Sequence, residues 1–280
     1  METVIEMPTR GALRKGPVAE GMARIKSNDI VTGDYRLMVL DAPPEMLDCR
    51  AGQFFHILCP TGESFRPYLR RPMSIYCFDP AAGELKFLYK VTGEGTGALS
   101  ELRDGAEVNL LGPLGNGFTI REDWKNLLLV ARGVGLATLA PLAKEAREAG
   151  CTLTAICSAR TEALLMSIAE FEAMGAEVIP VTDDAGTSGV EALREVIEGR
   201  IAEGGLDAMY TCGSNRILTL LQDIGARHAI PGEIALEQQM ACGLGMCHCC
   251  VRSFRREGGI VHERVCREGP VFDLQEAMGW

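Results

Sequence analysis

The chain has 280 residues, 47% of them hydrophobic, and is long enough for two or three folded domains. Its formal net charge of −10 argues against nucleic-acid binding through a general basic surface, because phosphate neutralisation needs clustered Lys and Arg. The N-terminus lacks the apolar core of an export signal, and the most apolar run, 126–143, is interrupted by Arg132 and Pro141. With 11 mostly scattered cysteines, we expect a reducing, cytoplasmic compartment and no membrane association.

Residues 18–118 are predicted to form a series of short strands. Each run holds four to eight β-prone residues and is closed by Gly or Pro, which is typical of antiparallel sheets. The runs fall within residues 29–43, 52–60, 71–80, 83–93 and 106–115. We therefore predict an antiparallel β-barrel or sandwich as the first domain, residues 1–118, with an N-terminal extension to about residue 18.

After Gly117 the pattern changes to strands that alternate with helices. Strands are expected at 124–131, 152–159, 177–184 and 208–213, with helices at 136–150, 167–175, 189–204 and 215–226. Such alternation predicts an α/β domain with a doubly wound parallel sheet over residues 119–229. Residues 230–280 are too few for a large core, so a metal centre is a natural source of stability there.

The last segment contains a glycine-punctuated cysteine loop. Cys242, Cys247 and Cys250 are spaced C-x4-C-x2-C, the spacing of plant-type [2Fe–2S] ferredoxins, and Cys266 follows. Gly243 and Gly245 would let the backbone adopt positive φ and wrap closely around the cluster. A structural zinc site is the alternative, although paired C-x2-C knuckles are more usual for zinc. Cys249, beside Cys250, is expected to be a non-ligand.

Two stretches of the first region have the chemistry of a flavin site. Residues 89–102 pass from a strand through a Gly-rich turn into a helix, where unpaired N–H groups can meet a diphosphate near Gly95 and Thr96. Arg71 can add a bidentate contact to the same diphosphate. Ser74 can hydrogen-bond the edge of an isoalloxazine ring. Each signal is weak when taken alone.

Taken together, several stretches are more specific: RRPMSIY (70–76), LYKVTGEGTG (88–97), LLGPLGNGF (110–118), CGSNRIL (212–218), EQQMACGLGMCHCC (237–250) and VCREGPVF (265–272). In this order they resemble the electron-transfer subunits of the two-component bacterial dihydroorotate dehydrogenases, which belong to the ferredoxin–NADP reductase-like flavoproteins. The resemblance runs from about residue 20 to residue 275. It implies a [2Fe–2S] cluster on Cys242, Cys247, Cys250 and Cys266, and FAD held by Arg71, Pro72, Met73, Ser74, Leu88, Tyr89, Lys90, Gly95 and Thr96.

The predicted nucleotide domain follows the family pattern less closely. Gly133 and Gly135 lie at a strand-to-helix turn that suits the diphosphate of NAD(H) or NADP(H). The family generally has Gly-Gly-Gly-x-Gly here, so Arg132 either contacts a phosphate or crowds the site. The resemblance places Cys212 and Gly213 near the nicotinamide, whereas Cys212 on its own is more typical of a buried strand end.

The combination of nicotinamide, flavin and iron–sulfur cluster predicts a converter between two-electron and one-electron transfer. It requires no acid–base residue. The resemblance implies a catalytic flavoprotein partner that oxidises dihydroorotate in pyrimidine biosynthesis, in a heterotetramer with two copies of each chain. One alternative is the same module serving another dehydrogenase, dihydropyrimidine-specific or ferredoxin-linked. A second alternative is a non-catalytic redox sensor.

Overall fold

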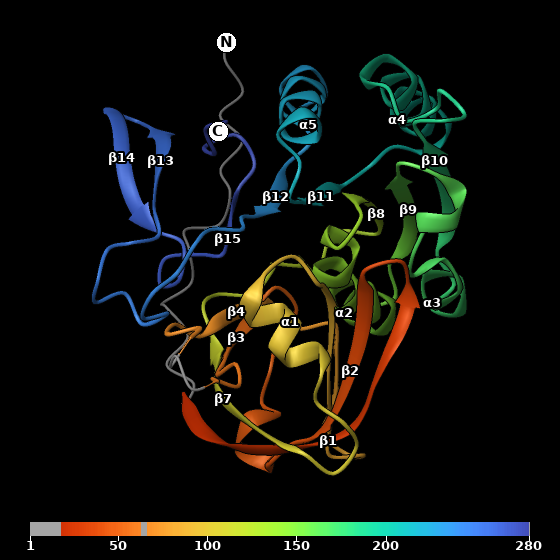
Figure 1. Ribbon diagram of the computed structural model, residues 1–280. Helices are drawn as coiled ribbons and strands as arrows, with labels where there is room; N and C mark the ends of the chain where they lie inside the picture. Colours follow the sequence, from red (N-terminus) through yellow and green to blue (C-terminus); the bar gives the residue numbers. More distant parts are fainter. Residues whose placement is uncertain (1–17, 63–65, 280) are drawn as a thin grey trace.

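The computed structural model describes residues 18–62 and 66–279, which form two sheets and a small C-terminal hairpin (Figure 1). The first sheet has seven strands in the order β4-β3-β7-β1-β2-β6-β5, and every neighbouring pair is antiparallel. Its strands are β1 (Ala19–Thr32), β2 (Tyr35–Asp41), β3 (Phe54–Ile57), β4 (Arg71–Ser74), β5 (Cys77–Asp79), β6 (Glu84–Lys90) and β7 (Glu107–Leu114). A 3-10 turn, Pro44–Met46, and the short helix α1, Glu94–Ser100, lie between them.

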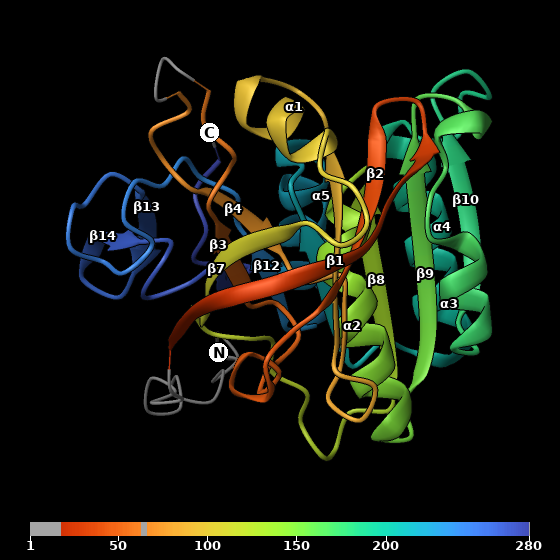
Figure 2. The same cartoon turned by 60° about the horizontal axis from the view of Figure 1, so that its bottom comes forward.

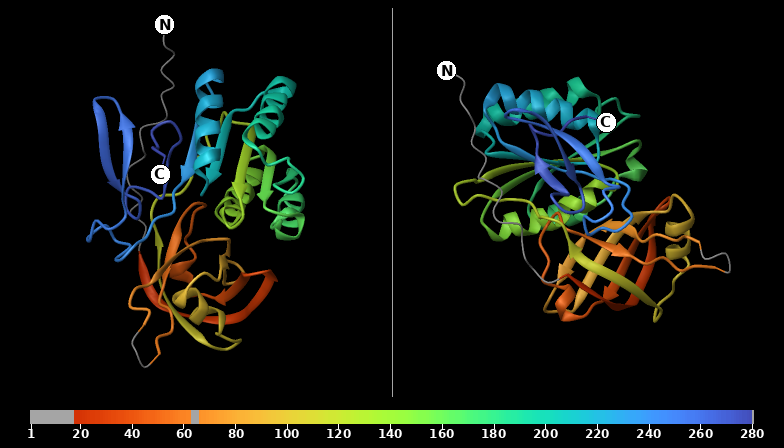
Figure 3. Two further views of the ribbon diagram at one scale, coloured as in Figure 1. Left: turned by 45° about the horizontal axis from the view of Figure 1, so that its top comes forward. Right: turned by 90° about the vertical axis from the view of Figure 1, so that its left-hand side faces the viewer.

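This sheet is antiparallel and curled, as expected of a barrel, but it stays open, so it is a half-barrel rather than a sandwich (Figure 3). The edge strands β4 and β5 do not pair with each other. Inside the curl, buried side chains such as Ile25, Leu40 and Phe87 form one apolar core. On the open side, Tyr76 and Leu88 belong to the same hydrophobic cluster as residues of the helix Gly135–Glu148. This packing covers the open side in place of a further strand.

The second sheet has six strands in the order β10-β9-β8-β11-β12-β15. It contains β8 (Asn126–Arg132), β9 (Thr152–Ala159), β10 (Glu177–Thr182), β11 (Ala208–Cys212), β12 (Gly232–Ala235) and β15 (Val271–Asp273). The first five strands are parallel, as the alternating pattern predicts, but β15 runs antiparallel and makes the sheet mixed.

Helices cover both faces of this sheet (Figure 2). They are α2 (Gly135–Glu148), α3 (Ile168–Ala173), α4 (Val190–Gly204) and α5 (Asn215–His228), with a 3-10 turn at Glu162–Leu164. Alternate residues of β8 face opposite sides: Leu127 and Leu129 pack with α2 and α3, whereas Leu128 and Val130 pack with α4 and α5. No helix of the described residues is long and apolar enough to cross a membrane.

The C-terminal residues are tied to the second sheet. β12 and β15 are two of its strands, although both lie after residue 229. The remaining strands, β13 (Val251–Arg256) and β14 (Gly259–Arg264), form an antiparallel hairpin. Phe254 of the hairpin stacks on Phe272 of β15 with ring centroids 4.1 Å apart. The cysteine loop, which lies between β12 and β13, therefore starts and ends on elements with a buried core.

Candidate functional site

A cavity of about 820 Å³ lies where the two sheets meet, and its walls include most of the residues predicted to hold a flavin. From the first sheet and its loops these are Arg71, Pro72, Met73, Ser74, Leu88, Tyr89, Lys90 and Thr96. The opposite wall comes from Val134 and Ala137 at the start of α2 and from the segment Leu236–Met240. Cavities of about 300–1,000 Å³ are typical of cofactor sites. The segment Leu236–Met240 ends two positions before Cys242.

Arg71 and Gly95, which the sequence places in separate motifs, are in contact. A Cβ atom on Gly95 would lie 2.7 Å from Nε of Arg71 and 3.1 Å from its Cγ, so the arginine lies directly over the glycine. The Arg71 guanidinium also donates a hydrogen bond to the carbonyl of Leu69 over 2.6 Å. The Thr96 hydroxyl accepts hydrogen bonds from N–H of Thr92 and Gly93, at 2.9 and 3.1 Å, and so fixes the turn before α1. The arrangement gathers a cation and a tight backbone turn at one side of the cavity.

Tyr89 lines the cavity, but its hydroxyl is already hydrogen-bonded within the protein. The ring is 2% exposed, and the hydroxyl donates to Oδ1 of Asn28 over 2.9 Å. Burial raises the pKa of this phenol, so it stays neutral at physiological pH. Lys90, the next residue, lies with Nζ 5.5 Å from the ring centroid of Tyr35. The wall therefore presents one cation held beside an aromatic ring, while the Tyr89 hydroxyl is directed to Asn28.

The strand-to-helix turn after β8 is closely packed. A Cβ on Gly135 would lie 2.7 Å from the carbonyl oxygen of Cys212, so α2 approaches β11 at van der Waals distance. The Cys212 thiol is 1% exposed and lies 3.5 Å from the Thr138 hydroxyl of α2. Burial strongly raises its pKa, so the thiol is protonated. Its side chain belongs to the core, while its carbonyl and Gly213 lie at the end of the strand.

Arg132 crosses the carboxyl ends of three neighbouring strands. Its guanidinium makes two hydrogen bonds to the carboxylate of Asp183, at 2.6 and 3.0 Å, and a third to the Ser158 hydroxyl at 3.1 Å. The Arg132 and Ser188 hydrogen bonds lower the pKa of Asp183 to about 2. The positive charge of Arg132, whose role the sequence leaves open, is thus paired with the carboxylate of Asp183, 51 residues away. Arg160, which follows β9, is exposed.

The four cysteines of the predicted cluster lie near one another. The Cys247 thiol acts on the pKa of Cys242, and the thiols of Cys250 and Cys242 act on that of Cys266. Burial raises the pKa of the Cys242 thiol, but backbone N–H groups of Cys247 and Leu244 outweigh it and bring the value to about 6. One of these hydrogen bonds, from Leu244 N to Cys242 Sγ, is 3.4 Å long. Backbone donors that face thiolates are the usual surroundings of iron–sulfur ligands.

The loop geometry agrees with the expectation for its glycines. Gly243 and Gly245 both have positive φ, +70° and +82°, where a side chain would be strained. Cys249 is exposed, and its Sγ lies 3.8 Å from the carbonyl of Gln239. In the described part of the chain, no three His, Cys, Asp or Glu side chains surround a single metal-ion position. Four cysteines fit a centre with two irons, each of which takes two protein sulfurs.

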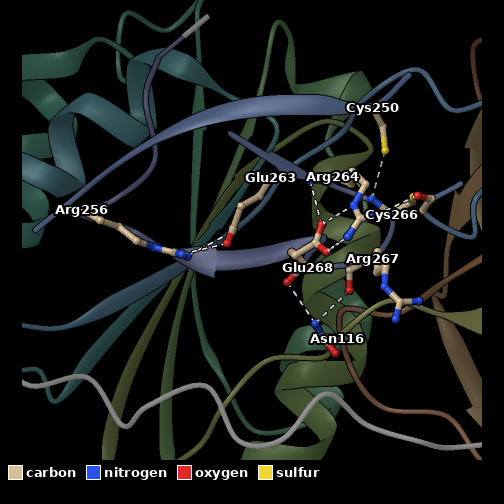
Figure 4. A network of polar contacts seen from close by, with 9 residues as sticks. Asn116, Cys250, Arg256, Glu263, Arg264, Cys266, Arg267 and Glu268 are labelled. Atoms are coloured by element: carbon tan, nitrogen blue, oxygen red, sulfur yellow. Dashed lines mark hydrogen bonds and ion pairs between the residues drawn. The ribbon is translucent and has the colours of Figure 1, made fainter. Parts of the chain in front are cut away.

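A polar network, which the sequence did not predict, supports the loop from below (Figure 4). Arg264 donates to the carbonyl of Gly245 over 2.9 Å and pairs with Glu268, whose carboxylate also accepts the Arg264 backbone N–H at 2.8 Å. Asn116, at the end of β7, donates to the Glu268 carbonyl over 3.0 Å. Cys266, between the two charged residues, donates its backbone N–H to Cys250 Sγ. The network joins the fourth cysteine to the loop of the first three.

Comparisons with known proteins agree with this geometry. A family model described as the iron–sulfur cluster binding domain of dihydroorotate dehydrogenase B matches residues 237–277. The electron transfer subunit of dihydroorotate dehydrogenase B (NAD(+)) from Desulforamulus reducens is 33% identical over 250 residues, which cover 89% of this chain and 95% of that protein. The chain belongs to the family of dihydroorotate dehydrogenase B electron transfer subunits. The subunit from Caldanaerobacter subterraneus is 37% identical, with 81% of this chain and 86% of that one covered.

Solved structures support the fold of this electron transfer subunit. An NADH-dependent reduced ferredoxin–NADP oxidoreductase, studied for flavin-based electron bifurcation, superposes with a TM-score of 0.76 at 26% identity, covering 92% of this chain and 90% of that one. A ferredoxin–NADP+ reductase from Plasmodium falciparum reaches a TM-score of 0.59 at 15% identity, with 76% and 95% covered, and shows likeness of fold alone. The predicted membership of a ferredoxin–NADP reductase-like family is confirmed.

The site of this family member also has parts that the sequence analysis missed. Phe54 of β3, Val134 just before α2 and Pro270 just before β15 all line the cavity, although none belongs to a flavin motif. The segment Leu236–Met240 is the largest omission. Its signal was present, since residues 237–240 open the stretch EQQMACGLG that carries part of the resemblance. Nothing in the sequence, however, indicated that it would face the first sheet.

Proposed function

We propose that this chain transfers electrons between NAD(H) and a catalytic flavoprotein dehydrogenase, through FAD and a [2Fe–2S] cluster. The observation that carries the proposal is the segment Leu236–Met240, which lines the 820 Å³ cavity and leads directly into Cys242. A flavin in that cavity and a cluster on that loop would be neighbours. The relatives are named NAD(+)-linked electron transfer subunits, which favours NAD(H) over NADP(H) as the nucleotide.

The residues that line the cavity suit FAD. Arg71 offers a guanidinium to the diphosphate, and Gly95 beneath it keeps the approach open. Ser74 at the end of β4 is available to the edge of the isoalloxazine ring, and Leu88 supplies an apolar wall. The chemistry that FAD supplies when bound is conversion between a two-electron hydride and single electrons. The protein's contribution is therefore to bind, orient and exclude water rather than to move protons through an acid–base residue.

The cysteine loop suits a [2Fe–2S] cluster for two reasons. Cys242, Cys247, Cys250 and Cys266 supply the four sulfurs that such a cluster takes, and backbone N–H groups point at Cys242 and Cys250. Deprotonated thiolates are the form that binds metal, and the lowered pKa of Cys242 agrees with such surroundings. Cys249 is proposed to be a non-ligand, since its thiol lies beside the Gln239 carbonyl.

For the nucleotide, we propose the carboxyl edge of the second sheet between β8 and β11. Ligands of open α/β sheets bind at the point where the strand order reverses, and β8 and β11 are neighbours on either side of it. Gly133 and Gly135 would let the diphosphate approach the start of α2, and Gly213 would border the nicotinamide. Arg132 does not need to be displaced for this, because Asp183 holds its guanidinium over β9 and β10.

In this proposal residues 1–118 hold FAD, 119–229 bind the nucleotide and 230–280 carry the cluster. Because β12 and β15 belong to the sheet of the middle segment, the last two segments would move together. The partner would be a dihydroorotate-type catalytic subunit, with two copies of each chain in the complex. The cytoplasmic location expected from the sequence stays a prediction.

The test is to purify the chain anaerobically, alone and with candidate partners. Alone, we expect one FAD and two irons per chain, NADH-dependent reduction of an artificial dye, and no oxidation of dihydroorotate. With its catalytic partner, dihydroorotate should reduce NAD+. A chain that oxidises dihydroorotate alone, or one that binds neither FAD nor iron, contradicts the proposal. Co-purification of a ferredoxin-linked flavoenzyme instead would favour the arrangement named in the structural relative.

A further inference from the structure

His56 is a fully buried imidazole between the flavin cavity and the cysteine loop. It lies on β3, two residues after Phe54, so both side chains are on the same face of the strand. Phe54 lines the cavity, and its ring meets the imidazole edge-on with centroids 5.9 Å apart. On its other side the imidazole lies against Gly243 of the cysteine loop. His56 has an exposed fraction of 0%.

Neither ring nitrogen of His56 has a hydrogen-bond partner within the described part of the chain. Leaving buried polar atoms unpaired costs free energy, and an apolar ring such as Phe would fill this space without that cost. Burial, together with the nearby positive charge of Arg70, lowers the pKa of His56 to about 4. The ring is therefore neutral at physiological pH and carries one N–H donor. That donor needs an acceptor, and residues 18–62 and 66–279 do not supply one.

The surroundings show on which side that acceptor lies. A Cβ on Gly243 would come within 3.0 Å of both Nδ1 and Cε1 of the imidazole, so the ring is pressed against the backbone next to Cys242. Toward the cavity, the ring of Phe54 covers the imidazole. The backbone carbonyl of His56 accepts a hydrogen bond from Arg70, a residue of the cavity wall, over 3.3 Å. The ring therefore faces the loop of thiolates rather than the cavity.

We propose that His56 donates its ring N–H to a sulfur atom of the iron–sulfur centre held by the Cys242 loop, and thereby raises the reduction potential of that centre. The inference rests on the proposed function, because it requires the cluster. Reduction adds negative charge to the sulfur atoms, so a hydrogen-bond donor stabilises the reduced form more than the oxidised one. His56 would act as a tuning residue that couples the first sheet to the loop.

The test is a redox titration of the holoprotein followed by EPR of the reduced cluster. His56→Phe removes the donor. We expect the equilibrium constant for one-electron reduction of the cluster to fall at least tenfold, which lowers its reduction potential by about 59 mV. His56→Gln keeps an N–H group and should restore part of the shift. The matched control is His248→Asn. His248 is an exposed histidine of the cysteine loop with φ +56°, a backbone conformation that asparagine tolerates. An unchanged cluster potential in His56→Phe, or a shift in the flavin potential alone, overturns the inference.

A second measurement needs no substitution of His56. The chain has four histidines, and two of them are bound elsewhere, His228 to Glu198 and His262 to Ser253. In the His248→Asn protein labelled with ¹⁵N-histidine, pulsed EPR of the reduced cluster should show coupling to a histidine nitrogen. Absence of coupling contradicts the role of His56, even if His56→Phe does not retain its cluster. Absence of any iron–sulfur signal contradicts the proposed function itself, so the two failures are distinguishable.

Discussion

Two glycines of one helix make a matched pair for testing the flavin site. In α1, Gly95 lies beneath Arg71, whereas a Cβ on Gly97 would meet nothing within 4 Å. Neither glycine has positive φ, so alanine fits the backbone at both positions. Gly95→Ala would bring a methyl group 2.7 Å from Nε and 3.1 Å from Cγ of Arg71, and the whole arginine side chain must change rotamer. Gly97→Ala leaves the arginine untouched.

The expected magnitudes separate stability from binding. Alanine is better than glycine in a helix by about 0.5–1 kcal/mol, and an off-rotamer arginine costs about 0.5–1.5 kcal/mol, so the unfolding free energy of Gly95→Ala should change little. FAD affinity should change more, because the charged hydrogen bonds of Arg71 to a diphosphate are each worth about 1.5–3 kcal/mol. Losing one corresponds to about a ten- to hundredfold weaker Kd. Gly97→Ala should keep the native Kd.

The assay titrates the apoprotein with FAD and monitors binding by the quenching of flavin fluorescence. Thermal unfolding of both variants is measured alongside. Equal FAD affinities of Gly95→Ala and Gly97→Ala would refute the assignment of Arg71 to the diphosphate. A loss of affinity accompanied by an equal loss of stability would also count against it, because the methyl group would then disturb the fold rather than the cofactor. Arg71→Ala should reproduce the Gly95→Ala affinity.

Three further predictions follow from the thiols and the ion pair. Cys250→Ser should lose the cluster absorbance and the bound iron, whereas Cys249→Ser should keep both, as metal analysis would show. Iodoacetamide at pH 8 should alkylate Cys249 but not Cys212, whose burial raises its pKa; peptide mass spectrometry that finds labelled Cys212 in the folded chain contradicts this. The Asp183 pKa of about 2 lies below its usual value of 3.8, so its pairing with Arg132 stabilises the fold above pH 4 and is lost as pH falls toward 2. Arg132→Ala should therefore lower the Tm at pH 7, and the difference from wild type should vanish near pH 2.

Local signals were the most reliable guide to this molecule. The C-x4-C-x2-C spacing keeps three thiols on one short loop whatever surrounds them, and in the structure a backbone N–H of that loop points at Cys242 Sγ. The strand-to-helix pattern of the second sheet was equally local, since Leu127 to Val130 alternate between two helical layers.

Features that depend on distant parts of the chain could not be read from the sequence. Closure of the first sheet depends on whether its edge strands meet, and here packing against α2 covers the open side instead. The antiparallel β15 joins the second sheet from the segment beyond Cys266, where only three residues are available as a strand. Such short strands carry little periodicity of their own, because their pairing is decided by the neighbouring strand.

Arg132 shows how a departure from a family pattern acquires a physical meaning only in three dimensions. A glycine at this position would leave the end of β9 uncovered, whereas the arginine spans it and binds Asp183 after β10. Because carboxyl ends of parallel strands share one edge, a charge introduced on one strand can be neutralised by the loop of another. The positive charge of Arg132 is thus neutralised within the protein, so in the proposed site a nucleotide diphosphate at Gly133 would not draw on it. Nucleotide affinity should consequently depend less on ionic strength than it would with a free arginine at the turn.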